Sequence, residues 1–271
     1  MAPEALARNI GNGVADIPQY SLGKTLLAWA AAAGPMAALG WVVTPALAHD
    51  PDNPGFARLA ILAIGLIWQF ILVVMLLYRE TGSLRWSGVQ HRLWLNTPRL
   101  PQSGERRRLW WWLVPLLVLA ALFDLQVRGT LNKFWVSIFP FLSQPPGLDF
   151  GTFLNSPDAR AQLVGNWRVL ALFVTSAVFN TVLGEELLFR GLLLPRMGAV
   201  FGRWDWITNG LLFGLYHLHQ PWGMLGSATA GMLLYALPSR YFHSAWFGII
   251  AHSGQSIYLT FLILGLVLGL A

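Results

Sequence analysis

Two adjacent glutamates and an arginine lie inside one of the most apolar stretches of this sequence. Glu185, Glu186 and Arg190 fall within a largely hydrophobic run over residues 167–194. Charged groups are costly inside a membrane, where they usually face a protein interior or a wet cavity and often serve a function. On an α-helix, Glu186 and Arg190 are four residues apart and can form an ion pair. Glu185 points about 100° away from Glu186 around the helix, which leaves its carboxylate available for chemistry.

Two histidines in later apolar segments could act together with Glu185. Counted from the segment ends that we assign to one side of the membrane, Glu185 is about 15 Å deep, His217 about 16 Å and His252 about 10 Å. A glutamate and a histidine at one depth can share a water molecule and deprotonate it. The second histidine, with nearby hydroxyl or amide groups, can stabilise the oxyanion that forms when this water attacks a carbonyl. The set indicates peptide hydrolysis without a covalent intermediate.

A zinc site and a purely structural role are the alternatives to this chemistry. Two histidines and a glutamate could supply three zinc ligands with water as the fourth, although the sequence lacks the His-Glu-x-x-His spacing of zinc peptidases. The structural alternative is an ion pair beside one protonated glutamate. We therefore expect no cofactor, with zinc as the less favoured possibility.

Composition places these residues in an integral membrane protein. The 271 residues are 55% hydrophobic and 11% charged, with a mean hydropathy of +0.53, whereas soluble domains carry roughly 25% charged residues. Cysteine is absent, which excludes a disulfide framework and a Cys-ligated metal. Basic residues that flank membrane helices explain the net charge of +6 better than nucleic-acid binding does. We expect membrane lipids and no nucleic acid among the partners.

Hydropathy predicts an all-α polytopic bundle with about seven or eight transmembrane spans. The predicted spans are residues 25–48, 57–78, 109–125, 167–194, 206–219, 222–237 and 245–271. A break near the polar residues of the last span would add the eighth. Residues 131–142 are too short for a span and are predicted to be an interfacial or re-entrant piece.

The predicted organisation has three parts. Residues 1–24 form an N-terminal cytoplasmic segment, residues 25–160 form transmembrane helices with an interfacial loop at 79–108, and residues 161–271 form the catalytic core. The loop holds seven arginines. Because Lys and Arg are enriched in cytoplasmic loops, we expect the N-terminus to be cytoplasmic.

Three short motifs occur in order on successive apolar segments. They are Glu185-Glu186-x-x-x-Arg190, Phe213-x-x-x-His217, and His252 with Ser256 four residues later. This pattern resembles the CPBP family, the CAAX proteases and bacteriocin-processing enzymes that are also called the ABI family. The prototype is the type II CAAX prenyl endopeptidase, an intramembrane glutamic protease. The resemblance covers about residues 167–260.

The resemblance implies a role for each motif residue. Glu185 would be the general base on water, helped by His217, and His252 would help to form the oxyanion site. The pair of Glu186 and Arg190 would hold the helix in place. Phe213, one turn before His217, would pack under the imidazole.

The resemblance also implies a fold and a setting. The fold would be a helix bundle around a conical cavity that opens toward the cytoplasmic side, with no requirement for zinc. The substrate would be a peptide or protein cleaved near the membrane surface, with a lipidated or membrane-associated C-terminal tail as one possibility. The breadth of the family favours a bacterial inner (plasma) membrane.

Ser256 is the one departure from the family pattern, which has Asn or Asp at this position. A serine can donate one hydrogen bond but lacks the reach of an amide. Gln255 has that reach but points about 100° away on an ideal helix. Ser256 could therefore serve as a weaker donor, or Gln255 could replace it if the helix is distorted. The remaining alternative is a non-catalytic membrane scaffold or bacteriocin-immunity-type relative.

Overall fold

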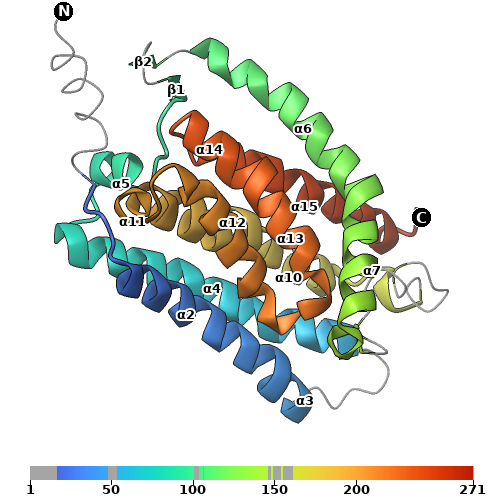
Figure 1. Cartoon of the computed structure of the whole chain (residues 1–271). Coiled ribbons are helices and arrows are strands. Elements are labelled where there is room, and N and C mark those ends of the chain that lie inside the picture. Colours follow the sequence, from blue (N-terminus) through green and yellow to red (C-terminus); the bar gives the residue numbers. More distant parts are fainter. Residues whose placement is uncertain are drawn as a thin grey trace, which may run out of the picture.

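The computed structural model describes residues 17–47, 54–100, 104–105, 107–145, 148, 154 and 161–270. Within these residues the regular structure is helical, apart from a short antiparallel pair of strands, β1 (Arg99–Leu100) and β2 (Gly104–Glu105). Five helices are long and apolar enough to cross a membrane: Leu22–Leu47, Phe56–Thr81, Arg107–Ile138, Trp167–Arg196 and Trp246–Val267. The protein is therefore an integral membrane protein with an all-α bundle (Figure 1).

These five helices correspond to five of the seven predicted spans. The other two predicted spans form shorter helices. They are α12 (Asp205–Tyr216) and a helix that runs from α13 (Met224–Ala230) through the π-helical segment Gly231–Ala236 into α14 (Leu237–Tyr241). At 1.5 Å per residue, α12 is about 18 Å long, which is little more than half of a hydrocarbon core of about 30 Å. A helix of this length that starts at the membrane surface ends within the membrane.

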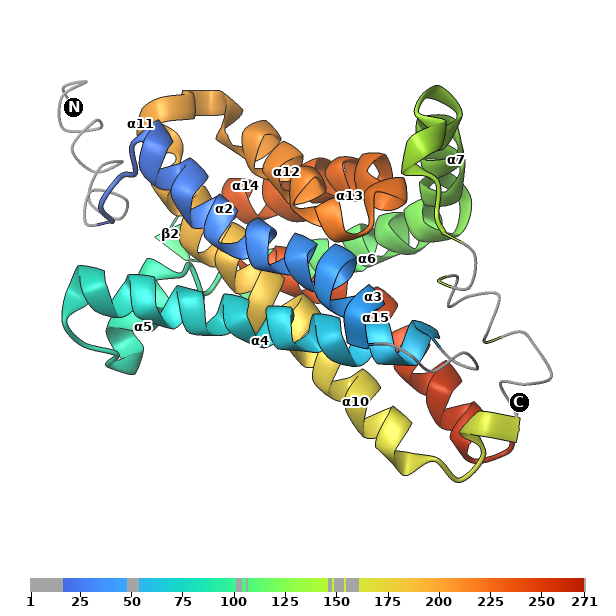
Figure 2. The same ribbon diagram turned by 90° about the horizontal axis from the view of Figure 1, so that it is seen from below.

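The chain does not break between the predicted span at residues 109–125 and the predicted interfacial or re-entrant piece at residues 131–142. The helix continues from α6 (Leu113–Leu122) through the π-helical segment Phe123–Val127 into α7 (Arg128–Ile138). The wider π turn keeps the backbone hydrogen-bonded while the helix changes direction, and α7 lies at an angle to α6 in both views (Figures 1 and 2).

The last predicted span is likewise a single helix, α15 (Trp246–Val267). The polar residues near His252 do not break it, because they face other helices of the bundle: His252 contacts Glu186, and Ser253 donates to Thr181. The possible eighth segment is therefore not formed.

The predicted loop at 79–108 holds short regular elements. The second span, α4 (Pro54–Thr81), ends inside the loop; α5 (Trp86–Arg92) and the β1–β2 pair follow.

The first span begins with α2 (Leu22–Ala38), which packs beside α4. The side chain of Ser21 caps its N-terminus by accepting a hydrogen bond from the backbone N–H of Lys24 at 3.2 Å. A π-helical segment then leads into α3 (Thr44–Leu47).

The helix Trp167–Arg196 passes through the centre of the bundle. It runs from α10 (Trp167–Val178) through two π-helical segments, Phe179–Gly184 and Leu187–Leu193, and every residue from 184 to 197 is buried. Helices α4, α12 and α15 pack around it, and the short α11 (Gly198–Phe201) follows. This enclosure keeps the charged residues of the stretch, Glu185, Glu186, Arg190 and Arg196, away from lipid.

Gly184 allows α4 to approach this central helix closely. A Cβ atom at this position would lie 2.2 Å from the carbonyl oxygen of Phe179 and 3.0 Å from that of Leu66 on α4. Only glycine fits between the two backbones. The residue therefore fixes the position of the π turn directly before Glu185.

Candidate active site

Three predicted site residues line one cavity of about 240 Å³. Glu185 comes from the central helix, His217 from the end of α12 and His252 from α15. Their exposed fractions are 2%, 7% and 7%. The sequence indicated comparable depths for these three residues, and in the structure they line one cavity together with other polar side chains.

The buried and the partly exposed lining residues divide the cavity into a floor and a mouth. The floor consists of Glu185, Phe213, His217, Ser227, Tyr235 and His252, which are all buried. The mouth consists of partly exposed residues: Arg128, Asn132, Asn180, Gln220, Trp222, Gly223 and Gln255. Its residues come mainly from α7 and from the turn after α12.

Two hydrogen bonds hold α7 against that turn and the first turn of α13 (Met224–Ala230). The indole N–H of Trp135 donates to the carbonyl of Pro221 at 3.0 Å, and Asn132 accepts from the backbone N–H of Gly226 at 3.0 Å. Irregular backbone at membrane depth is tolerated where it is buried in protein or lines a water-filled cavity. The turn after α12 meets this condition because it forms part of the mouth.

An asparagine that the sequence analysis missed holds the carboxylate of Glu185. With its amide nitrogen turned toward Glu185, Asn180 donates to both carboxylate oxygens at 2.8 and 3.2 Å. The two residues are five positions apart, which on an α-helix would separate them by about 140°. The π-helical segment Phe179–Gly184 has a wider turn and brings positions i and i+5 onto one face.

The ring of His217 is fixed by its own helix. Its Nδ1 lies 2.8 Å from the carbonyl oxygen of Phe213. Because a carbonyl only accepts, Nδ1 carries the proton and Nε2 of the neutral ring is free to accept. The ring of Phe213 meets that of His217 edge-on at 4.9 Å and that of His252 at 5.8 Å, so Phe213 packs against both imidazoles.

His252 is held by Glu186 and not by Glu185. Its Nδ1 lies 3.0 Å from Oε1 of Glu186, and the same oxygen accepts from Nη1 of Arg190 at 2.8 Å. Arg190 also donates to the carbonyl of Gly231 at 3.0 Å. The ring of His252 stacks on Tyr235 with centroids 4.7 Å apart. The ion pair that the sequence predicted is present, and it also orients the second histidine.

One family of known proteins matches part of the chain. Residues 166–258 match the family described as type II CAAX prenyl endopeptidase Rce1-like. We call these residues, about one third of the chain, the Rce1-like domain after this match. Neither the curated proteins nor the solved structures contain a match to the chain.

The Rce1-like match implies a peptidase of the CAAX protease type, an intramembrane endopeptidase. The matched residues contain all three motifs and every buried residue of the cavity floor. Helices α2, α4, α6 and α7 lie before the match. Of these helices, α7 nevertheless contributes to the site, because it supplies Arg128 and Asn132 to the mouth.

Gly248 lets α15 of the Rce1-like domain lie against the ion pair. A Cβ atom here would be 2.5 Å from Oε2 of Glu186 and 3.1 Å from the Cγ atom of Arg190. That Glu186 oxygen is buried and has no hydrogen-bond partner among the described residues. Such under-satisfied buried groups are unusual in folded proteins, and here one lies beside the candidate site.

In the third motif, the residue that lines the cavity after His252 is not the one that the family pattern indicates. Gln255 lines the cavity of the Rce1-like domain, whereas Ser256 is not part of the lining. The helix shows no distortion at this point, so Gln255 reaches the cavity from regular geometry. Gln255 follows His252 by three residues on α15, and both residues line the cavity.

Metal-binding geometry is not apparent in the part of the chain that the structure describes. There, no group of three or more His, Cys, Asp or Glu side chains is arranged to hold a metal ion. Nδ1 of each cavity histidine already has an oxygen partner, in Phe213 and Glu186 respectively.

Proposed function

We propose that this chain is an intramembrane glutamic endopeptidase in which Glu185 and His217 activate a water molecule. One observation carries the proposal: Glu185, His217 and His252 converge on a single polar cavity from three segments of the chain. Glu185 takes a proton as the water attacks the substrate carbonyl, while Nε2 of His217 accepts the second hydrogen bond from that water. Protonated Glu185 then donates to the leaving amine, so that the peptide bond breaks and the carboxylate is restored.

The oxyanion donors in this mechanism are His252 and Gln255. With both ring nitrogens protonated, His252 donates from Nδ1 to Glu186 and from Nε2 to the oxyanion. The amide of Gln255, which lies at the cavity mouth, takes the place that the family pattern gives to residue 256. Preorganised donors of this kind each contribute about 10²–10³ in rate. Glu186 and Arg190 act as positioning residues because they hold His252 and do not touch the substrate.

The substrate in this proposal is a peptide that enters the membrane-embedded cavity at its mouth. The mouth lies at the α7 end of a helix whose other end carries Arg107 and Arg108. Basic segments favour the cytoplasm, so the end with Arg107 and Arg108 should be cytoplasmic. The N-terminus, two spans earlier, lies on the same side. The mouth is at the other end of this helix and therefore does not face the cytoplasm as well. We propose that the N-terminus is cytoplasmic, in a bacterial inner membrane, and that the mouth faces the opposite half of the bilayer.

The cleavage test uses a library of membrane-tethered reporter peptides in liposomes. Wild type should cleave at least one reporter, and Glu185→Ala and His217→Ala should each lose about 10²–10⁴ of the rate. His91→Ala is the matched control, since His91 is partly exposed and does not line the cavity. Full activity in either cavity variant would remove the mechanism.

The same experiment distinguishes two other functions. Cleavage that a chelator abolishes and zinc restores would indicate a zinc peptidase. The position of Ser256 outside the cavity lining favours the second alternative, a non-catalytic scaffold. A folded wild-type protein that cleaves no reporter, and whose cellular phenotype survives Glu185→Gln, would support the scaffold.

A further inference from the structure

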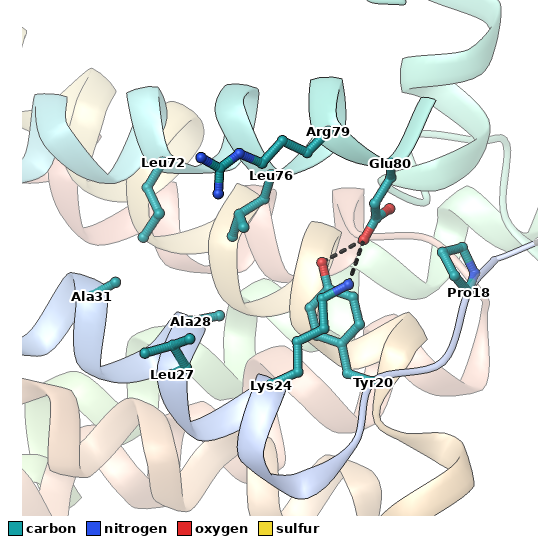
Figure 3. Close-up of a pocket in the computed structure, with 10 residues that line it drawn as sticks. All are labelled: Pro18, Tyr20, Lys24, Leu27, Ala28, Ala31, Leu72, Leu76, Arg79 and Glu80. Atoms are coloured by element: carbon teal, nitrogen blue, oxygen red, sulfur yellow. Dashed lines mark hydrogen bonds and ion pairs between the residues drawn. The ribbon is translucent and has the colours of Figure 1, made fainter. Parts of the chain in front are cut away.

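A second, larger concavity lies between α2 and α4 and shares no lining residue with the active-site cavity. Its volume is about 520 Å³. One wall is formed by Leu27, Ala28 and Ala31 on α2, and the other by Leu72 and Leu76 on α4 (Figure 3). The alanines on α2 are too small to fill the space between the helices, so they leave an apolar groove.

Two cations line this groove, and both belong to residues near one end of it: Lys24 beside Glu80, and Arg79 directly before Glu80 on α4. The guanidinium of Arg79 extends back along α4 toward Leu76 and Leu72 (Figure 3). The carboxylate of Glu80 is already occupied by Arg196, whose Nη2 lies 2.7 Å from Oε2. Lys24 is 3.9 Å from Glu80 and 48% exposed. The side chain of Arg79 is exposed and has no hydrogen bond or ion pair with another described residue. Lys24 and Arg196 therefore share the single carboxylate of Glu80, and Arg79 has no counter-charge.

We propose that this groove binds an anionic phospholipid. Its phosphate group contacts Lys24 and Arg79, and one acyl chain lies between α2 and α4. Basic side chains next to the bilayer attract anionic headgroups, while the apolar walls match an acyl chain and extend about 10 Å from Lys24 to Ala31. A zwitterionic lipid of the same chain length offers the same apolar contact without the net charge.

Such a lipid would stabilise the packing of α2 on the bundle. Tyr20 lies two residues before α2. Its backbone N–H donates to the carbonyl of Arg196 at 2.9 Å, and its hydroxyl donates to Glu80. The groove therefore borders the contacts that connect α2, α4 and the central helix. Occupancy should raise the thermal unfolding temperature of the purified protein.

The test compares phosphatidylglycerol and phosphatidylcholine with identical acyl chains. Native mass spectrometry of detergent-purified full-length protein measures how much of each lipid is retained, and thermal unfolding in the same detergent is the second readout. The variants are Lys24→Gln and Arg79→Gln at the charged end and Ala31→Leu in the groove. Arg85→Gln is the matched control, because Arg85 is also an exposed arginine near the end of α4 but does not line the groove.

Wild type should retain phosphatidylglycerol in preference to phosphatidylcholine and gain thermal stability from it. Each loss of a cation should weaken phosphatidylglycerol binding about fivefold, with no change in Arg85→Gln. Ala31→Leu should reduce binding of both lipids while the folded protein keeps its unfolding temperature without lipid. Equal retention of the two lipids by wild type, or equal losses in Arg79→Gln and Arg85→Gln, would overturn the proposal.

Discussion

Arg190 and Arg196 lie on the same helix, are both fully buried and both pair with a glutamate, yet their surroundings differ. Every guanidinium nitrogen of Arg196 has a partner: Glu80 and the carbonyls of Arg92 and Leu192. Around Arg190, both its own Nε and Oε2 of Glu186 lack hydrogen-bond partners among the described residues.

This difference separates a structural cluster from a positioning cluster. The Arg196 cluster, which consists of Arg196, Glu80 and Tyr20, connects α4, the chain before α2 and the central helix. All of its polar side-chain groups have hydrogen-bond partners. The Arg190 cluster leaves hydrogen-bonding capacity unused but fixes His252 beside the cavity. We infer that the first mainly stabilises the fold and that the second mainly orients a side chain of the site.

The largest effect on stability should come from Arg196→Ala. Removing one partner of a buried ion pair costs about 3–5 kcal/mol, and we expect the lower end of this range because Lys24 still lies 3.9 Å from Glu80. Thermal unfolding in detergent should show this loss, while cleavage per folded molecule should stay near wild type. An Arg196→Ala protein that is as stable as wild type would contradict the structural role.

Glu186→Gln should have the opposite profile. The amide keeps the shape of the carboxylate and can still accept from Arg190, but it holds the imidazole of His252 less firmly. Misplacement of a group in the site by about 1 Å can cost about 10²-fold in rate. We expect a loss of this order in cleavage with a small change in unfolding temperature. An unchanged cleavage rate would show that the Arg190 cluster does not act on the site.

Asn180→Ala should have a smaller effect on cleavage. A hydrogen bond to a charged group contributes about 1.5–3 kcal/mol, so removing this donor from Glu185 should slow cleavage about 10- to 100-fold. Thr175 provides a control on the same helix, since its hydroxyl bonds only to the carbonyl of Ala171 among the described residues and Thr175 does not line the cavity. Equal rates in Asn180→Ala and Thr175→Ala would remove Asn180 from the site.

The side of the membrane on which the mouth lies can be tested with single cysteines, because the chain has none of its own. Gly88 on α5 and Gly223 at the mouth both have open space where a side chain would begin. In sealed vesicles, an impermeant thiol reagent should label Gly88→Cys and Gly223→Cys from opposite sides. Labelling of both from one side would contradict the proposed position of the mouth.

The sequence predicted the long apolar helices and the motif residues because both depend on local patterns. It did not predict Asn180 as a partner of Glu185, because a spacing of five residues places the two together only in a π turn. The contact between His252 and Glu186 depends on how α15 packs at Gly248, which hydropathy does not report. The same reason explains why Gln255 and not Ser256 reaches the cavity.

A double-mutant cycle on Glu185 and His217 tests the central claim most directly. Cleavage rates of Glu185→Gln, His217→Ala and the double variant are measured on the best reporter peptide in liposomes. If the two residues act on one water molecule, their effects are not additive, and the double variant should be no slower than the slower single variant. Losses that multiply in the double variant, or a single variant that keeps the wild-type rate, would contradict a shared water.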